Sequence, residues 1–113
     1  MTPYIAKVED AMGKADVVDA KIKRMGNDIY WFGVTVLHRD EGWDHYADKW
    51  DVVSPDGTVL GTRTLLHPHV EEQPFTRSLD GVKIPGTVQK VIIRAHDSTH
   101  DYGGKEVAVD LPH

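Results

Sequence analysis

DIYWFGVTVLH, residues 28–38, is the strongest strand candidate in the chain and decides its fold class. β-Branched and aromatic residues dominate it, and both types favour β-strands. Side chains alternate along a strand, so one face carries Tyr30, Phe32, Val34 and Val36, and the other carries Ile29, Trp31, Thr35 and Leu37. A strand that is apolar on both faces is typical of the centre of a sheet, with its outer face covered by a loop or a partner. His38 ends the run in the same phase as Tyr30.

Shorter apolar segments separated by turn residues flank this run on both sides. Val18, Ala20 and Ile22 alternate with charged residues ahead of a Gly26-Asn27 turn, which indicates a half-buried strand. The sequence Pro55-Asp56-Gly57-Thr58 predicts the turn of a hairpin. The other strands are expected at residues 49–54, 59–66, 87–95 and 105–111, residues 78–84 are expected to be a short strand or a turn, and no helical periodicity is present.

About seven short strands with a turn roughly every 8–12 residues predict an all-β fold. We expect residues 15–113 to form a single antiparallel β-sandwich, immunoglobulin-like or fibronectin-III-like in architecture, with a small β-barrel as the alternative. The cysteine and tryptophan pairing of antibody domains is absent, so the likeness concerns architecture alone. Residues 1–14 are expected to be a poorly specified N-terminal lead-in.

Composition narrows the class of protein. The chain has 113 residues, 40% hydrophobic and 27% charged, as in soluble globular domains. A formal net charge of -5 with scattered Lys and Arg argues against nucleic-acid binding. No apolar run approaches the roughly 18 residues of a membrane span, and the N-terminus lacks the basic region and apolar core of a signal peptide.

Two cellular locations stay open: the cytoplasm, or the bacterial periplasm if Met1 begins a mature form. A protein partner or a second copy could dock on the apolar face of residues 28–38.

Two unusual loops, residues 42–48 and 67–77, carry most of the candidate binding residues. Cysteine is absent and seven histidines are present, so a metal site would use imidazole and carboxylate ligands. His67 and His69 flank a proline and point the same way in extended backbone, so both could hold one Zn²⁺ or Cu²⁺ ion. The alternative is that these histidines only hydrogen-bond backbone groups and stabilise the loop. The further candidate ligands are Glu71 or Glu72 and, if the two loops meet, His45, Asp44 or His38.

The first loop and the strand after it also suggest a ligand or partner surface, formed by Trp43, Asp44, Tyr46 and Trp50. Exposed tryptophan and tyrosine beside acids are typical of surfaces that bind sugars or peptides. The alternative is that these aromatic side chains plug the open end of a small sandwich core.

A catalytic site is the least favoured interpretation. Asp97-Ser98-Thr99-His100-Asp101 contains the residue types of a nucleophilic triad, but no nucleophile elbow is present and five neighbours in one loop make a poor triad. We expect Asp97 and Ser98 to form an Asx-type or Ser-type turn instead, with His96 and His100 exposed.

The strings GWDHYAD at 42–48 and LLHPHVEEQPFTRSL at 65–79 resemble segments of small uncharacterised bacterial proteins, many of them exported. The likeness covers most of residues 15–111 and implies a bacterial source and a periplasmic location. No activity is established for that family, so no residue's role carries over from it. The sequence therefore predicts a non-enzymatic binding module with a transition-metal site in its histidine-rich loops. The alternative is a structural or protein-interaction sandwich without metal, in which the loops serve only to stabilise the fold.

Overall fold

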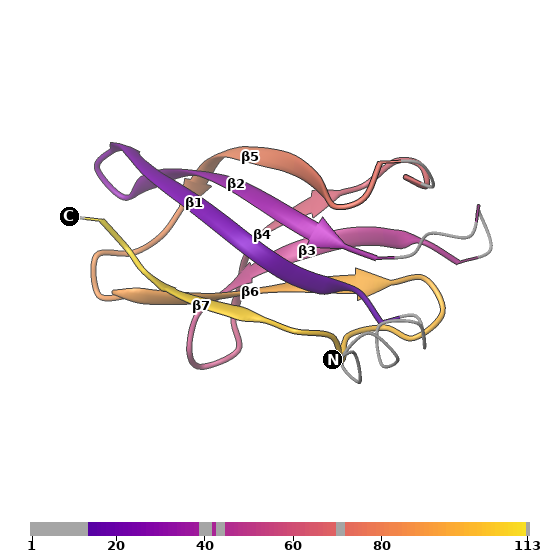
Figure 1. The fold of residues 1–113 in the computed structure, drawn as a ribbon. Helices are drawn as coiled ribbons and strands as arrows, with labels where there is room; N and C mark the ends of the chain where they lie inside the picture. Colours follow the sequence, from indigo (N-terminus) through magenta and orange to yellow (C-terminus); the bar gives the residue numbers. More distant parts are fainter. Residues whose placement is uncertain (1–13, 39–41, 43–44, 70–71, 113) are drawn as a thin grey trace, which may run out of the picture.

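The computed structural model describes residues 14–38, 42, 45–69 and 72–112. These residues form seven strands in two antiparallel sheets, with no helix among them (Figure 1). One sheet has the strand order β1-β2-β5, and the other has the order β4-β3-β6-β7. The strands are β1 Asp16–Gly26, β2 Ile29–Leu37, β3 Ala47–Val53, β4 Val59–Thr64, β5 Phe75–Lys83, β6 Lys90–Asp97 and β7 Val107–Asp110. The expected all-β sandwich is confirmed, and the two separate sheets distinguish it from a closed barrel.

Strand β2 is the centre of the three-stranded sheet, as its two apolar faces predict. It pairs with β1 on one side and β5 on the other. Its inner face, from Tyr30 to Val36, is buried against the opposite sheet. On its outer face the Trp31 ring lies across Gly33, where an added Cβ would come within 2.5 Å of the indole. Lys23 Nζ lies 5.0 Å from the centre of the same ring. The sheet's own side chains therefore cover part of this face.

Trp50 lies in the core between the sheets. Its side chain is fully buried on β3, together with apolar side chains of β2 and β6. The prediction that Trp50 belongs to a ligand surface is therefore corrected. Its position in β3 shares the inward phase of Val52, and alternation along the strand directs both side chains into the core.

A β-bulge changes the phase of β1. The register with β2 shifts between Val17 and Asp19, so Val17 is buried while Val18 is 41% exposed. The prediction that Val18 faces inward is wrong for this reason. Just before the bulge, Val17 N donates a 2.8 Å hydrogen bond to the carbonyl of Lys105, which precedes β7. The start of β1 thus reaches across to the second sheet.

Three connections gather at one end of the sandwich, on the right in Figure 1: β2–β3, β4–β5 and β6–β7. We call this the loop end. His38 N donates to Gln73 Oε1 at 2.8 Å, which ties the first connection to the second. Ser98 N donates to the Tyr46 carbonyl at 2.9 Å, which ties the first to the third. The described parts of all three connections are therefore fixed to one another.

Residues 1–13 of the expected lead-in lie outside the described residues.

In the part of the chain that the structure describes, no helix is long and apolar enough to cross a bilayer.

Candidate metal centre

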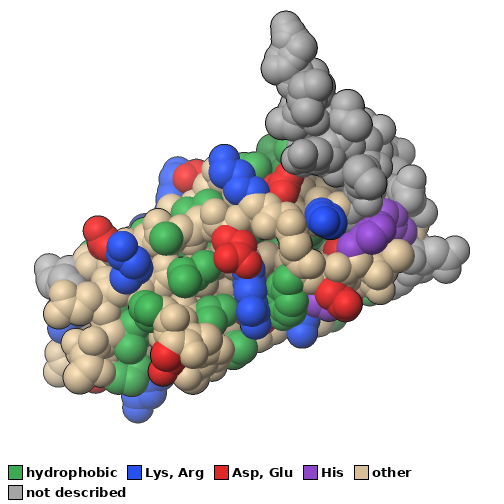
Figure 2. Space-filling model, turned by 90° about the horizontal axis from the view of Figure 1, so that it is seen from below, with side chains coloured by type: hydrophobic (Ala, Val, Ile, Leu, Met, Phe, Trp, Pro, Cys, Tyr) green, Lys and Arg blue, Asp and Glu red, His purple; other side chains and the backbone are tan. Residues whose placement is uncertain are grey.

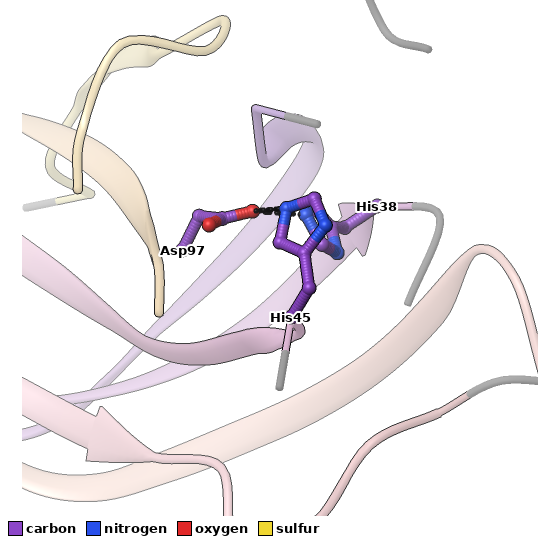
Figure 3. Close-up of side chains that lie close together, drawn as sticks. All are labelled: His38, His45 and Asp97. Carbon is purple, nitrogen blue, oxygen red and sulfur yellow. Dashed lines mark hydrogen bonds and ion pairs between the residues drawn. The ribbon is translucent and has the colours of Figure 1, made fainter. Parts of the chain in front are cut away.

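His38, His45 and Asp97 converge at the loop end, and we call them the His–Asp cluster (Figure 3). His38 follows β2 and continues the inward phase of Tyr30 and Val36. Asp97 ends β6 in the inward phase of its buried apolar residues. Because both strands end at the same end of opposite sheets, alternation delivers an imidazole and a carboxylate into one layer of the core. His45 joins them from the β2–β3 connection.

Both imidazoles converge on one carboxylate oxygen. Asp97 Oδ2 accepts a hydrogen bond from His45 Nε2 at 2.8 Å and another, short one from His38 Nε2. The two rings are 4.9 Å apart and nearly perpendicular, at 83°, so they meet edge to face. The side chains of His38 and Asp97 are fully buried, whereas that of His45 is 15% exposed. The cluster therefore has a closed inner side and a partly open outer side.

The second oxygen of Asp97 is held by the backbone. Asp97 Oδ1 accepts hydrogen bonds from Thr99 N at 2.6 Å and from His100 N at 2.8 Å. This is an Asx-type turn, one of the two turn types that the sequence predicts here. Burial acts to raise the pKa of Asp97, but these backbone donors and the charges of His38 and His45 outweigh it, so the pKa lies below its ordinary value. The buried side chain is therefore an ionised carboxylate with fixed orientation.

Two imidazole nitrogens and one carboxylate oxygen form a ligand set for Zn²⁺ or Cu²⁺. The three ligand atoms lie within 4.8 Å of one another. Bonds of about 2.0–2.2 Å in a tetrahedral site place ligand atoms roughly 3.3–3.6 Å apart, so small side-chain shifts would let these residues hold one ion. Among the residues that the structure describes, His38, His45 and Asp97 are the group of at least three histidine, cysteine or acidic side chains whose ligand atoms lie close enough together to hold one ion.

The β6–β7 connection beside the cluster is anchored to the outer face of the four-stranded sheet. The Tyr102 hydroxyl donates a short hydrogen bond to the buried carboxylate of Asp51, and the Arg94 guanidinium lies 4.0 Å from the ring centre. Burial first, and then the hydrogen bond and charge of Asp51, raise the pKa of Tyr102.

His96 is half-buried against the Tyr102 ring, so the prediction that it is exposed is wrong. Its ring nitrogens contact Asp48 at 2.6 Å and Asp101 at 3.1 Å. In Figure 2, histidine side chains reach the surface at one end of the molecule.

The histidine pair of the second loop is placed differently from the cluster. His67 is exposed, and its ring centre lies 4.6 Å from that of His69. His69 is buried and stacks on Phe75 at 4.0 Å, with 11° between the ring planes. Glu71 lies outside the described residues, so metal binding by His67, His69 and Glu71 stays a prediction. His45, the fourth member of that predicted set, lies in the His–Asp cluster instead.

The other predicted surface residues are only partly placed. Trp43 and Asp44 lie outside the described residues. Tyr46 is half-buried, and its backbone exchanges hydrogen bonds with Ser98. A surface formed by these residues therefore stays a prediction.

Sequence patterns predict Asp97 only as part of a turn and His38 only as a further candidate ligand. The signal that could have found them is the inward phase at the ends of two strong strands. What this signal does not contain is the packing of the two sheets, which brings the ends of β2 and β6 together.

Comparison with known proteins gives one relative and no family. The chain is 43% identical over 97 residues, 86% of its length, to a protein of the archaeon Halomicrobium mukohataei described as "Putative lipoprotein". The match covers 47% of that protein, so the chain spans about half the length of this relative. No family model matches the chain. No solved structure matches it.

Proposed function

We propose that this protein is a non-enzymatic binding module that holds one transition-metal ion, Zn²⁺ or Cu²⁺, in the His–Asp cluster. The observation that carries the proposal is the convergence of three ligand atoms from His38, His45 and Asp97 at the loop end. Imidazole and carboxylate ligands suit these divalent ions, whereas Cu⁺ favours the thiolate and thioether ligands that the cluster lacks.

The three residues would have different tasks. His38 is a buried ligand whose backbone is fixed by Gln73. Asp97 supplies the negative charge, and its turn holds one oxygen so that the other faces the imidazoles. His45 is partly exposed and lies on the side from which an ion would enter. Metal binding would exchange the hydrogen bonds between the imidazoles and Asp97 for coordinate bonds, with release of protons.

The test is a calorimetric titration of chelator-treated protein with Zn²⁺, followed by Cu²⁺. We expect one equivalent to bind, and His45→Ala to weaken binding at least about tenfold, since even loss of an outer partner of a ligand costs that much. His67→Ala is the matched control because it removes an exposed loop histidine outside the cluster. If His67→Ala abolishes binding while His45→Ala does not, the His67–His69 pair is the site and the proposal fails.

A structural role without metal is the second candidate. It is supported by the hydrogen bonds of Asp97, which already join the two imidazoles to the β6–β7 connection. Under this hypothesis wild-type protein shows no heat of binding at stoichiometric Zn²⁺ or Cu²⁺. The partly covered outer face of β2 would then be the contact for a protein partner or a second copy, which sedimentation velocity would detect as concentration-dependent association.

We propose that the protein is exported from the cytoplasm. The lipoprotein description of the relative supports it, together with the resemblance to exported bacterial proteins. Fractionation of the native host, with an antibody against this chain, would place the protein. Recovery in the cytosolic fraction would contradict export.

A further inference from the structure

A third histidine stands at the open side of the His–Asp cluster. His100 Nδ1 lies 3.4 Å from Asp97 Oδ1, and the His100 ring centre lies 4.9 Å from that of His45. The side chain is 35% exposed, compared with 15% for His45 and none for His38. The three imidazoles thus run from the core to the surface around one carboxylate.

The backbone of His100 is fixed relative to Asp97. Its N–H donates to Asp97 Oδ1 at 2.8 Å as part of the Asx-type turn. The connection that follows is anchored through Tyr102 to Asp51. Side-chain rotation is therefore the motion needed for the imidazole to face the other ligand atoms, and such rotation is fast and inexpensive for a partly exposed residue.

Three protein ligands leave one position of a tetrahedral ion open. That position must be filled by water, by a further molecule or by another side chain. On the inner side, the buried His38 and Asp97 close the cluster. The fourth ligand must therefore approach from the exposed side, where His100 lies.

We propose that His100 is the fourth ligand and closes the metal site from the solvent side, giving a set of three imidazoles and one carboxylate. This inference rests on the proposed function and deepens it, because it specifies what kind of site the cluster is. Four protein ligands are typical of closed, non-catalytic sites, whereas three ligands plus water are typical of hydrolytic ones. Closure by His100 therefore agrees with a binding module rather than an enzyme.

The experiment compares wild-type protein, His100→Ala and His96→Ala, each loaded with one equivalent of Cu²⁺ and examined by electron paramagnetic resonance with pulsed nitrogen detection. We expect His100→Ala to lose one of three imidazole couplings and to bind Zn²⁺ roughly 10–100-fold more weakly in competition with a chelator. Free imidazole should restore the lost coupling, because the vacated position faces solvent. His96→Ala is the matched control: it removes a half-buried β6 histidine beside Asp97 that is not part of the cluster.

Three outcomes separate the hypotheses. Metal binding by wild-type protein, with the same nitrogen count and affinity in His100→Ala, overturns the role of His100 and leaves the proposed function standing. Absence of metal binding by wild-type protein overturns the proposed function itself, and the role of His100 with it. Equal losses in His100→Ala and His96→Ala would assign the effect to distortion of the loop and also overturn the ligand role, and circular dichroism of each variant checks its fold.

Discussion

Replacing Asp97 by Asn tests how much the cluster contributes to stability without metal. The carboxylate accepts two backbone hydrogen bonds through Oδ1 and two imidazole hydrogen bonds through Oδ2. Asn keeps one oxygen for the backbone donors but places an NH₂ group against the two imidazoles. Two charge-assisted hydrogen bonds, each contributing about 1.5–3 kcal/mol, are then lost. A change of tautomer in His38 or His45 recovers part of the loss, so we expect unfolding free energy to fall by about 2–4 kcal/mol.

Urea denaturation in the presence of a chelator, at neutral pH, measures this difference. The matched control is Asp101→Asn, the same chemical change four residues further on. The Asp101 side chain is 82% exposed, and its φ of 59° lies in the left-handed region that Asn tolerates as well as Asp. We expect that control to change the unfolding free energy by less than about 0.5 kcal/mol. Equal, small effects of the two substitutions would refute the view that the buried carboxylate organises the loop end.

Two further predictions concern the scaffold. Gly104→Ala should destabilise the fold by about 3 kcal/mol or more, because its Cβ would lie 1.8 Å from the backbone oxygen of Ala15. Gly26→Ala, whose Cβ meets nothing within 4 Å, should change stability by less than about 1 kcal/mol in the same denaturation assay, and a Gly104 variant as stable as it would contradict the close contact. The pKa of Asp56 is lowered mainly by the Ser54 hydroxyl, so Asp56 stabilises the fold above its unfolded value of 3.8, and this contribution is lost as pH falls through the folded value. Ser54→Ala should raise the pKa of Asp56 towards that ordinary value in an NMR titration, and an unchanged pKa would argue against the hydrogen bond.

Local patterns in the sequence predict strands well and their irregularities poorly. Apolar residues occupy both faces of β2, so its central position follows from the sequence. In β1 the same reasoning assigns Val18 to the core, because nothing in the local composition marks the bulge between Val17 and Asp19. A bulge depends on how two strands pair, and a single strand's sequence does not contain that information. The inward position of Trp50 likewise depends on which face of β3 meets the other sheet.

The candidate site shows the same limit at longer range. Phase along β2 and β6 predicts that His38 and Asp97 face the core. It does not predict that the two strands, 59 positions apart at these residues, end at the same height in opposite sheets. The motif His67-Pro68-His69 is conspicuous because only one residue separates its two histidines in the sequence. Because successive side chains of a strand point to opposite faces, the inward side chains that meet in one layer of a sandwich come from strands distant in sequence, as His38 and Asp97 do.

The residue types of the His–Asp cluster indicate a role beyond filling the end of the core. Burying a carboxylate is costly, and the attraction of two imidazoles at best offsets that cost. Apolar side chains of similar volume would close the end of a sandwich at equal or lower free energy, as they do elsewhere in this core. Stability alone therefore does not explain why Asp97 and His38 are fully buried there. A site that must bind a cation needs both a buried charge and fixed imidazoles, and the cost in stability is then the consequence of keeping the ligands in position before the ion arrives.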